Sequence, residues 1–265
     1  MEHFSAPRLA SAEDTNGLVA SFTTHYGDSS DGRKHNIALA ARLIDGTVIL
    51  PEDEFSFNDT VGARTEERGF RTAYVIQDGE YVEGTGGGVC QVSTTLYNCA
   101  LLAGLVVTRS RPHSLPVGYV APSFDAMVSS ESDLRFANIL PAPITLRMYA
   151  DGNYLRAEIR GVPSGISVRR RSVTLETLPA KTTYIDDPTL PAGSETVELT
   201  GRNGLRSEGW LEFSRDGKAL AAVRIRRDCY LPQTRVIRRG TALHQENQEN
   251  IVGEGVTPSR FHTFY

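Results

Sequence analysis

One stretch of the chain combines a glycine loop with apolar residues at helical spacing. Three glycines occupy residues 86–88, and glycine lets the backbone adopt positive φ angles. The apolar positions that follow fall at i, i+4, i+7, i+8 and i+11, namely Val92, Leu96, Cys99, Ala100 and Ala103. Gly104 then provides a stop signal. The pattern predicts a largely buried helix that begins near Cys90, directly behind a flexible loop.

The remaining apolar pattern predicts one more helix and a series of short strands. The second helix is indicated over residues 35–43, where apolar side chains gather on one face. Phe55 and Phe57 lie two residues apart, which predicts an extended segment with both rings in the core. Asp-Gly signals predict hairpin turns at residues 77–80 and 151–153. Strands are predicted at residues 17–26, 47–50, 73–76, 81–82, 106–113, 117–120, 133–138, 144–149 and 154–159.

Breaks in this pattern divide the chain into five parts. Residues 1–16 are polar and lack periodicity, which is typical of a leader or linker. Helical periodicity disappears after the glycine- and proline-rich stretch that begins at residue 161. The predicted parts are a leader at 1–16, a first domain at 17–160, a linker at 161–172, a second domain at 173–241 and a tail at 242–265. The predicted fold class is α+β, with a mixed domain of helices and antiparallel sheet followed by an all-β domain.

Charge and hydropathy exclude two classes of partner. The 265 residues carry a formal net charge of −4, and the pI is about 5.9. A nucleic-acid-binding domain usually presents a basic face, so we expect no nucleic acid as partner. No apolar run reaches the roughly 18 residues that suggest a transmembrane helix, and no signal peptide opens the chain.

The three cysteines, Cys90, Cys99 and Cys229, do not form an even disulfide framework. Cys90 and Cys99 are separated by nine positions on one predicted helix, so their side chains point to nearly opposite faces. Cys99 belongs to the apolar stripe and is expected to be a buried small side chain, and Cys229 is also interpreted as structural. Cys90 differs, because free N–H groups and the helix dipole lower the pKa of a thiol on a first helical turn.

Cys90, His113 and Asp125 form the candidate catalytic set. In this hypothesis the Cys90 thiolate attacks an amide or thioester carbonyl, His113 acts as general base and acid, and Asp125 orients the imidazole. The order of a helix cysteine, a strand histidine and a strand aspartate resembles the transglutaminase-like and papain-like arrangement. Asp133 is a second candidate for orienting His113. The other interpretation stays equally open: a small residue packed under the loop, a strand histidine and a turn-capping aspartate.

Neighbouring residues are candidates for substrate binding. The amides of the first helical turn, or the Gln91 side chain, could hold a developing oxyanion. The predicted substrate-binding residues are Gly87, Gly88, Gln91 and Ser93. No metal site is predicted, because no short-range pair such as C-x-x-C or H-x-x-x-H is present. No cofactor is predicted either, since the glycine run lacks the lysine of a phosphate-binding loop.

The first domain resembles a known family. The runs that carry the resemblance are HNIALAARLIDGTVILPEDEFSFNDTVGARTEERGF, GGGVCQVSTTLYNCALLAGL, RPHSLPVGYVAPSFDAMV and DLRFANILPAPI. Together they resemble the VanW family of bacterial cell-envelope proteins, named after glycopeptide-resistance gene clusters. Two departures concern loops: Pro51-Glu52 stands where a proline–glycine pair is usual, and residues 123–127 stand where a glycine and a threonine are usual. The resemblance implies an N-terminal membrane anchor, which we expect in the full-length protein and not within this sequence.

The second domain resembles the five-glycine (G-five) domain of bacterial surface proteins. Five glycines stand at positions expected for its turns: Gly193, Gly201, Gly204, Gly217 and Gly240. The resemblance implies an elongated, flat β structure with little core, used as a spacer or adhesive module. The basic run at residues 224–227 is interpreted as a solvated strand face.

Two functions follow from these residues and resemblances. The first is a cell-wall enzyme: a cysteine amidase, endopeptidase or transpeptidase that acts on peptidoglycan stem peptides. The second is a non-catalytic envelope module that binds cell-wall glycan or peptide. In both, we expect the protein to work outside the cytoplasmic membrane, with peptidoglycan as partner and a membrane link only through the implied anchor.

Overall fold

The computed structural model describes residues 17–77 and 80–242, and these residues are mainly β-strand. Strands account for 49% of them and helices for 16%. The predicted α+β class, with a papain-like or transglutaminase-like first domain, is therefore wrong. The two helical patterns dominate the sequence signal, whereas the strands are short and pair in several small sheets.

The described chain forms two compact units that interleave along the sequence. The first comprises the residues up to Lys181 together with Gly201–Thr234. The second comprises Thr182–Thr200 together with the residues from Arg235 onward. Every described helix lies in the first unit, as do all the described sheets except one.

A four-stranded antiparallel sheet with the strand order β1-β9-β8-β2 supports the first unit. Its strands are β1 (Gly17–His25), β2 (Val48–Ile49), β8 (Ile144–Ala150) and β9 (Tyr154–Gly161). The β8–β9 hairpin confirms the predicted turn at residues 151–153. Along β8, Ile144, Leu146 and Met148 are buried and alternate with more exposed residues. One face of this strand therefore enters the core.

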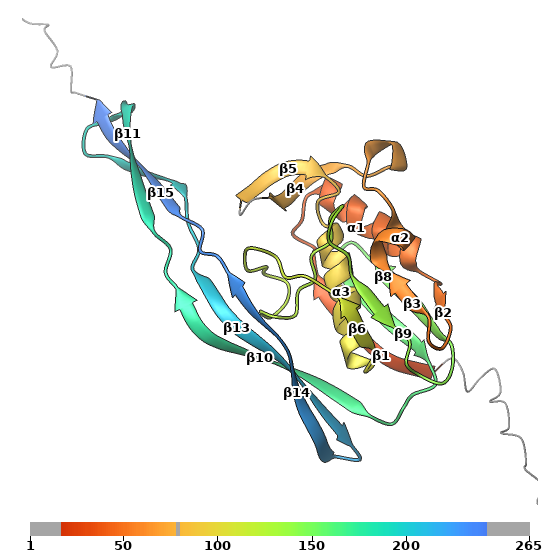
Figure 1. Cartoon of the computed structure of the whole chain (residues 1–265). Coiled ribbons are helices and arrows are strands. Elements are labelled where there is room, and N and C mark those ends of the chain that lie inside the picture. The colour runs from red at the N-terminus through yellow and green to blue at the C-terminus, as the bar shows by residue number, and fades with distance from the viewer. Residues whose placement is uncertain (1–16, 78–79, 243–265) are drawn as a thin grey trace, which may run out of the picture. The chain divides into compact units, whose positions relative to one another are not determined.

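Two helices pack on that sheet, α1 (Asp31–Ile44) against β8 and α3 (Val89–Leu102) against β1 and β9 (Figure 1). The apolar stripe of α3 is enclosed, with Val92 and Leu96 completely buried. The predicted buried helix behind the glycine loop is thus confirmed. The other predicted helix is confirmed as well, although it begins earlier than residue 35.

Shorter elements connect these layers. A three-stranded sheet has the order β3-β7-β6, formed by β3 (Glu54–Ser56), β6 (Val106–Arg109) and β7 (Arg135–Ala137). The other short elements are α2 (Phe57–Val61), the 3-10 turn η2 (Glu66–Arg68), and the hairpin strands β4 (Thr72–Gln77) and β5 (Glu80–Thr85). The predicted hairpin strands pair as expected, while the Asp-Gly turn at 78–79 lies outside the described residues.

Ser56 ends the extended segment earlier than predicted. Its Oγ accepts a hydrogen bond from the Asp59 N–H at 3.1 Å, which is the arrangement of a helix N-cap. Phe57 consequently opens α2 instead of continuing the strand. Phe55 and Phe57 are nevertheless both buried, as the pattern predicts.

The chain between β6 and β7 runs as coil, with turns and bends, over residues 110–134. The strand predicted at 117–120 does not form, and His113 and Asp125 lie on this coil instead of on strands. Three prolines interrupt the segment, and a proline cannot donate to a strand ladder. This is the feature that separates the fold most clearly from a papain-like arrangement, in which a sheet carries the histidine and its partner.

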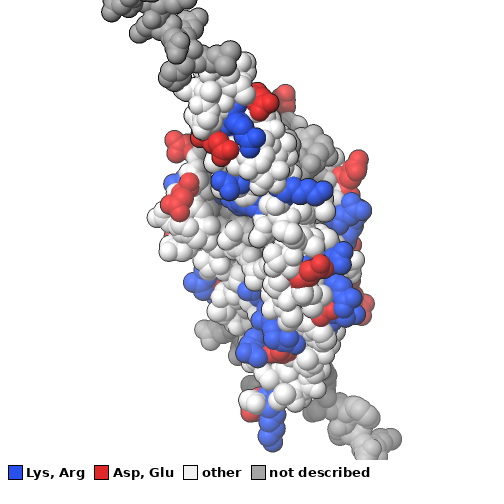
Figure 2. All heavy atoms as spheres, turned by 90° about the vertical axis from the view of Figure 1, so that its left-hand side faces the viewer, with Lys and Arg blue, Asp and Glu red and all other residues white. Residues whose placement is uncertain are grey.

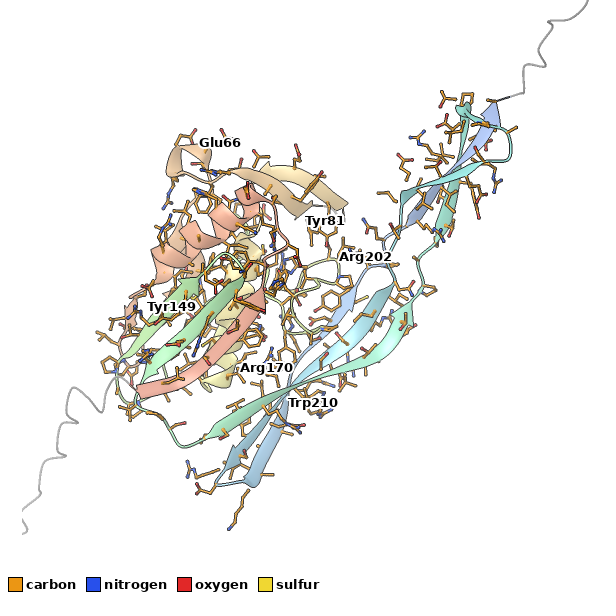
Figure 3. The ribbon with its side chains drawn as sticks, turned by 180° about the vertical axis from the view of Figure 1, so that it is seen from behind. Glu66, Tyr81, Tyr149, Arg170, Arg202 and Trp210 are labelled. Atoms are coloured by element: carbon orange, nitrogen blue, oxygen red, sulfur yellow. The ribbon has the colours of Figure 1, made fainter. Side chains whose placement is uncertain are left out.

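An antiparallel sheet of order β10-β13-β14 completes the first unit. Its strands are β10 (Ser167–Leu178), β13 (Gly204–Arg215) and β14 (Lys218–Tyr230). Leu211 of β13 belongs to the same core as α3. Arg170 projects from β10 (Figure 3), and its guanidinium lies 4.2 Å from the ring centre of Phe22 and 4.9 Å from that of Phe124. The sheet is therefore packed against the helical region by apolar and cation–π contacts.

The second unit is a sheet of order β11-β15-β12. Its strands are β11 (Thr182–Pro191), β12 (Glu195–Leu199) and β15 (Arg235–Ala242). β11 runs parallel to β15, and β12 runs antiparallel to it. Among the described residues of this unit, Ile237 is the one buried apolar side chain. This sheet therefore has almost no core of its own.

Two of the five glycines of the second predicted domain lie in strands and not in turns. β13 begins at Gly204, where a Cβ would overlap the carbonyl oxygen of Tyr230. Gly240 lies in β15, where a Cβ would overlap the carbonyl oxygen of Pro191. The prediction of turns is wrong at these two positions, because close backbone approach is what requires glycine there. The other three have positive φ outside the strands: Gly193, Gly201 and Gly217.

Candidate functional site

The three glycines before α3 are required by the backbone geometry. Gly86 and Gly88 have φ angles of 90° and 102°, in the region that favours glycine. A Cβ at Gly87 would lie 2.6 Å from the carbonyl oxygen of Tyr74, so no side chain fits there. The Gly87 carbonyl accepts a hydrogen bond from the Asn36 side chain at 3.0 Å. The start of α3 is thereby fixed to α1.

Cys90 is a free, half-buried cysteine on the first turn of α3. Its sulfur lies 3.4 Å from the Val128 carbonyl oxygen and 3.5 Å from the Val128 nitrogen, whose N–H donates to it. Burial opposes ionisation of the thiol, but a hydrogen bond and the charge from His113 outweigh it and lower the pKa of Cys90. The Val128 N–H and the charge of Arg64 act in the same direction. The site therefore favours the thiolate.

His113 and Asp125 meet on the coil that covers the start of α3. The Asp125 Oδ2 accepts a hydrogen bond from His113 Nδ1 at 2.7 Å and another from the His113 backbone N–H at 2.6 Å. The two side chains are only 4% and 1% exposed, so water does not screen their interaction. Because Nδ1 is bound to the carboxylate, Nε2 is the ring nitrogen left for the Cys90 sulfur.

The three groups shift one another's pKa values. Burial by itself would lower the pKa of His113, but its hydrogen bonds to Asp125 and Cys90 raise this pKa to about 9. Burial by itself would raise the pKa of Asp125, but the hydrogen bond and charge of His113, with the charge of Arg226, hold it below its usual range. The lowered pKa of Cys90, the raised pKa of His113 and the lowered pKa of Asp125 all favour a thiolate, an imidazolium and a carboxylate in sequence.

This sequence of groups suits nucleophilic acyl transfer. A thiolate is the reactive form of cysteine, and an imidazolium beside it can protonate a leaving amine. A buried carboxylate on the far nitrogen fixes the ring orientation and the tautomer. The free N–H groups of the first turn of α3 are donors that a developing oxyanion could use.

The predicted substrate-binding side chains point into the protein. Gln91 is 1% exposed, and its Nε2 donates to the His25 carbonyl at 2.8 Å. Ser93 is fully buried, and its Oγ donates to the Ala126 carbonyl at 2.6 Å. These bonds tie α3 to β1 and to the coil. Direct contact of substrate with the four predicted residues stays a prediction.

Asp133 is engaged elsewhere. Its carboxylate accepts hydrogen bonds from Ser56 Oγ at 2.7 Å, from the Asn58 N–H at 2.9 Å and from Arg135 Nε at 2.8 Å. These bonds hold β3, α2 and β7 together. The geometry does not support the alternative in which Asp133 orients the catalytic histidine.

One arginine of the basic run in β14 points inward. The side chain of Arg226 is 12% exposed, and its Nη2 donates to Asp125 Oδ1 at 2.9 Å. Arg224 and Arg227 instead bind the carboxylate of Glu208. The interpretation of the run as a solvated strand face is therefore wrong at Arg226, although its neighbours at 224 and 227 are exposed.

Three further side chains of the site were missed by sequence analysis. Tyr230 of β14 donates to Asp125 Oδ1 at 2.5 Å. Arg33 and Arg64 pack their side chains beside the glycine loop, and each lies close enough to Cys90 for their charges to interact. All three are distant from Cys90 in sequence. No local motif could have signalled them.

Neither a metal cluster nor a membrane-spanning helix is found in the described chain. Over residues 17–77 and 80–242, no group of three or more His, Cys, Asp or Glu side chains could hold a metal ion. The helices in those ranges are too short or too polar to span a bilayer.

Fold and site together define a strand-rich protein with a cysteine–histidine–aspartate cluster at the start of a buried helix. Residues 32–160 match the family model described as VanW like protein. Residues 169–242 match the model described as G5 domain. The chain thus contains a VanW domain followed by a G5 domain, and both predicted resemblances are confirmed.

Two curated relatives support this assignment. The chain is 43% identical over 130 residues to the "Uncharacterized protein YoaR" of Bacillus subtilis (strain 168), which covers 49% of this chain and 43% of that protein. It is 26% identical over 83 residues to the "Vancomycin B-type resistance protein VanW" of Enterococcus faecalis (strain ATCC 700802 / V583), which covers 31% and 30%. The chain is homologous to both and spans less than half the length of each.

Two solved structures are similar to part of the chain. The "IgA1 Protease G5 domain structure" is 18% identical, covers 29% of this chain and 92% of its own, and has a TM-score of 0.22. The "Crystal structure of HP0197-G5" is 26% identical, covers 29% and 100%, and has a TM-score of 0.18.

Proposed function

We propose that this chain is part of a cell-envelope protein that acts on peptidoglycan peptides through a cysteine acyl-transfer site. A VanW domain and a G5 domain in one chain are consistent with work at the cell wall. The observation that carries the proposal is the hydrogen-bonded series of Cys90, His113 and Asp125. Such a series supplies a nucleophile, a proton donor and an orienting carboxylate.

The reaction proceeds in two stages. The Cys90 thiolate attacks the carbonyl carbon of a peptide bond, and N–H groups at the start of α3 stabilise the oxyanion. The amine leaves with the proton from His113, and a thioester remains on Cys90. Neutral His113 then removes a proton from the second nucleophile as it attacks the thioester, which releases the thiolate. Water as nucleophile gives hydrolysis, whereas the amine of another stem peptide gives a cross-link.

Arg33 and Arg64 favour an anionic substrate. The hydrogen-bond partners of Arg33 are neutral, namely Ser29 Oγ at 2.6 Å and Gln91 Oε1 at 2.7 Å. Arg64 donates to the Asn58 side-chain oxygen at 2.7 Å. A substrate carboxylate near the scissile bond would complement the charge of both guanidinium groups. Stem peptides of peptidoglycan carry such carboxylates.

A non-catalytic binding module is the second candidate. The observation that favours it is the enclosure of the site: the Cys90 sulfur lies against the Val128 backbone, and Gln91 and Ser93 are used inside the protein. In this function the glycine loop and its arginines would bind a cell-wall peptide or glycan without breaking a bond.

Incubation with purified peptidoglycan, followed by mass spectrometry of the released peptides, tests the enzymatic proposal. We expect new fragments or new cross-links with the wild type, and a rate at least about a thousandfold lower with Cys90→Ala, because the nucleophile is lost. Cys229→Ala is the matched control, since Cys229 is exposed and outside the site. Equal products from Cys90→Ala would exclude the mechanism. Retention on cell walls without any product would establish the binding module instead.

A further inference from the structure

The carboxylate of Asp125 receives hydrogen bonds from two different parts of the chain. His113 donates both of its bonds to Oδ2. Oδ1 accepts one hydrogen bond from Arg226 Nη2 at 2.9 Å and one from the Tyr230 hydroxyl at 2.5 Å. Both of these residues lie about a hundred positions later in the chain. Each oxygen of this buried carboxylate is therefore bound on both of its lone-pair directions.

A register shift in β14 brings Arg226 to the inner face. The partners of β13 and β14 shift between Gly209, which pairs with Arg226, and Trp210, which pairs with Arg224. The extra residue, Ile225, makes a β-bulge and reverses the alternation of side chains. Arg226 and Tyr230 consequently face the coil, whereas Arg224 turns to the other face.

The coil approaches this strand pair closely. A Cβ at Gly209 would lie 2.8 Å from the Ser123 carbonyl oxygen, so only glycine fits. The Ser123 N–H donates to the Tyr230 hydroxyl at 2.7 Å, and its Oγ is 2.8 Å from Ser207 Oγ. The hydroxyl of Tyr230 thus accepts from the coil and donates to Asp125, which fixes the carboxylate two residues farther along the same coil.

The burial of Arg226 is not explained by fold stability. Its Nη1 is buried with no hydrogen-bond partner in the described chain, and an unpaired buried donor is destabilising. Its Nε binds Asp228 at 2.6 Å, and its guanidinium carbon lies 5.7 Å from the ring centre of Tyr97. A buried ion pair adds little net stability compared with apolar packing. The arginine is therefore better explained by what its charge does to Asp125.

We propose that Arg226 and Tyr230 are positioning residues of the Cys90 site, so that the first unit's G5 strands complete the site of the VanW domain. They hold Asp125 ionised and aligned, Asp125 holds His113 as imidazolium, and the imidazolium holds Cys90 as thiolate. The inference rests on the proposed role of Cys90 as nucleophile. It adds to that role a function for the G5 segment, which would contribute residues to the site in addition to acting as a spacer or adhesive module.

The effect should be visible in the reactivity of the thiol. Without Arg226 or Tyr230, the buried carboxylate has less positive charge or fewer donors around it and takes up a proton at higher pH. A neutral Asp125 no longer supports the imidazolium, so the thiolate is lost at higher pH as well. The other titratable or charged groups that face this cluster are Arg33, Arg64, Tyr97, Tyr119 and Asp228.

The test is the rate of Cys90 alkylation as a function of pH, without any substrate, in full-length variants that all carry Cys229→Ala. We expect Arg226→Met to move the acid limb of the profile upward by about one pH unit, which is about a tenfold lower rate on that limb. Tyr230→Phe moves it in the same direction, and Arg226→Lys, which keeps the charge, moves it less. Arg227→Met is the matched control, since Arg227 is the exposed neighbour on the same strand.

Two results would overturn the proposal. One is an unchanged acid limb in both Arg226→Met and Tyr230→Phe, the variants that remove the charge and the hydroxyl. The other is an equal shift in Arg227→Met, which would indicate a general effect on the sheet. Failure of the enzymatic proposal is recognised separately, because peptidoglycan would then stay intact while the alkylation profile still depends on Arg226 and Tyr230.

Discussion

The sheet under α3 and the sheet of the second unit have opposite surroundings. In the first, Leu146, Leu155 and Ile159 are completely buried. In the second, Val197 and Leu199 of β12 are 48% and 44% exposed. Hydrophobic burial is the main source of stability in folded proteins. The comparison shows that the first sheet is stabilised by a core, whereas the second depends on its ladder and on surface ion pairs.

The ion pairs of the two regions also differ in how deeply they are buried. The pair of Asp125 and Arg226 is buried, with side chains 1% and 12% exposed. In the second unit, Arg238 binds Glu198 at 2.9 Å, and both side chains are about 40% exposed. Figure 2 shows acidic and basic side chains interspersed over the visible face, without a large patch of one sign. Both members of the ion pair at the site are thus buried, whereas both members of the pair in the second unit are exposed.

The largest expected effect concerns the two kinds of packing. Leu96→Ala should lower the free energy of unfolding by about 3–4 kcal/mol, because it removes a completely buried side chain and leaves a cavity. Val197→Ala in β12 should change it by less than about 0.5 kcal/mol. Urea unfolding followed by circular dichroism measures both. Similar losses in the two variants would show that the second sheet has a core that its exposure does not reveal.

The second prediction concerns how the unfolding free energy depends on pH through the buried groups of the site. The folded pKa of His113 is raised to about 9 from 6.5, so its stabilising effect is complete below pH 6.5 and disappears as pH rises through 9. The pKa of Cys90 is lowered, so its effect is present above the ordinary thiol pKa and is lost on acidification. Between pH 6.5 and about 8.5 the two effects oppose each other. The wild-type unfolding free energy should therefore change less with pH there than that of a variant without the Cys90 thiol.

Cys90→Ala separates the two effects. The hydrogen bond that His113 donates to Asp125, which raises the pKa of His113 most, remains in this variant. Its unfolding free energy should therefore fall by about 1 kcal/mol between pH 6.5 and 8.5, a larger fall than that of the wild type. Unfolding curves at the two pH values provide the measurement. A constant value in Cys90→Ala would mean that His113 is neutral without the thiolate.

The smallest expected effect is on the exposed ion pairs of the second unit. Arg238→Met should weaken protection of the β12 and β15 amides only slightly at low salt. At 1 M salt the difference from the wild type should shrink, because exposed charges are screened. Hydrogen exchange read residue by residue measures this. An effect that persists at high salt would point to packing by the arginine stem instead of charge.

Local patterns predicted the local parts of this structure. The glycine run and the apolar stripe beginning at Val92 suffice for α3, because both act within a few residues. The Asp-Gly signal likewise suffices for the β8–β9 hairpin. The coil over residues 110–134 was misread, since β-branched residues at 117 and 120 suggest a strand but find no partner edge there. Strand propensity needs a neighbour, which a single sequence does not display.

Only the part of the candidate site around Cys90 was predictable from the sequence. Cys90 is signalled by its place behind the glycines, whereas Arg226 and Tyr230 meet Asp125 across 101 and 105 residues. The bulge at Ile225 that turns Arg226 inward has no sequence signature in a run of arginines. The two departures from the VanW pattern are informative: Glu52 and Ser123 have φ angles of 70° and 65°. Non-glycine residues there keep a glycine-like loop conformation and accept its strain.

The interleaving of the two units has a consequence for how such proteins can be recombined. The chain leaves the first unit after Lys181 and forms β11 and β12 of the second unit. It returns to the first unit at Gly201 and leaves it again after Thr234. No single cut therefore separates one unit from the other. A chain shortened before β14 would keep Cys90, His113 and Asp125 but lose both donors to Asp125 Oδ1. Exchange of one G5 domain for another would thus preserve the site only if the incoming strand supplied an equivalent arginine and tyrosine.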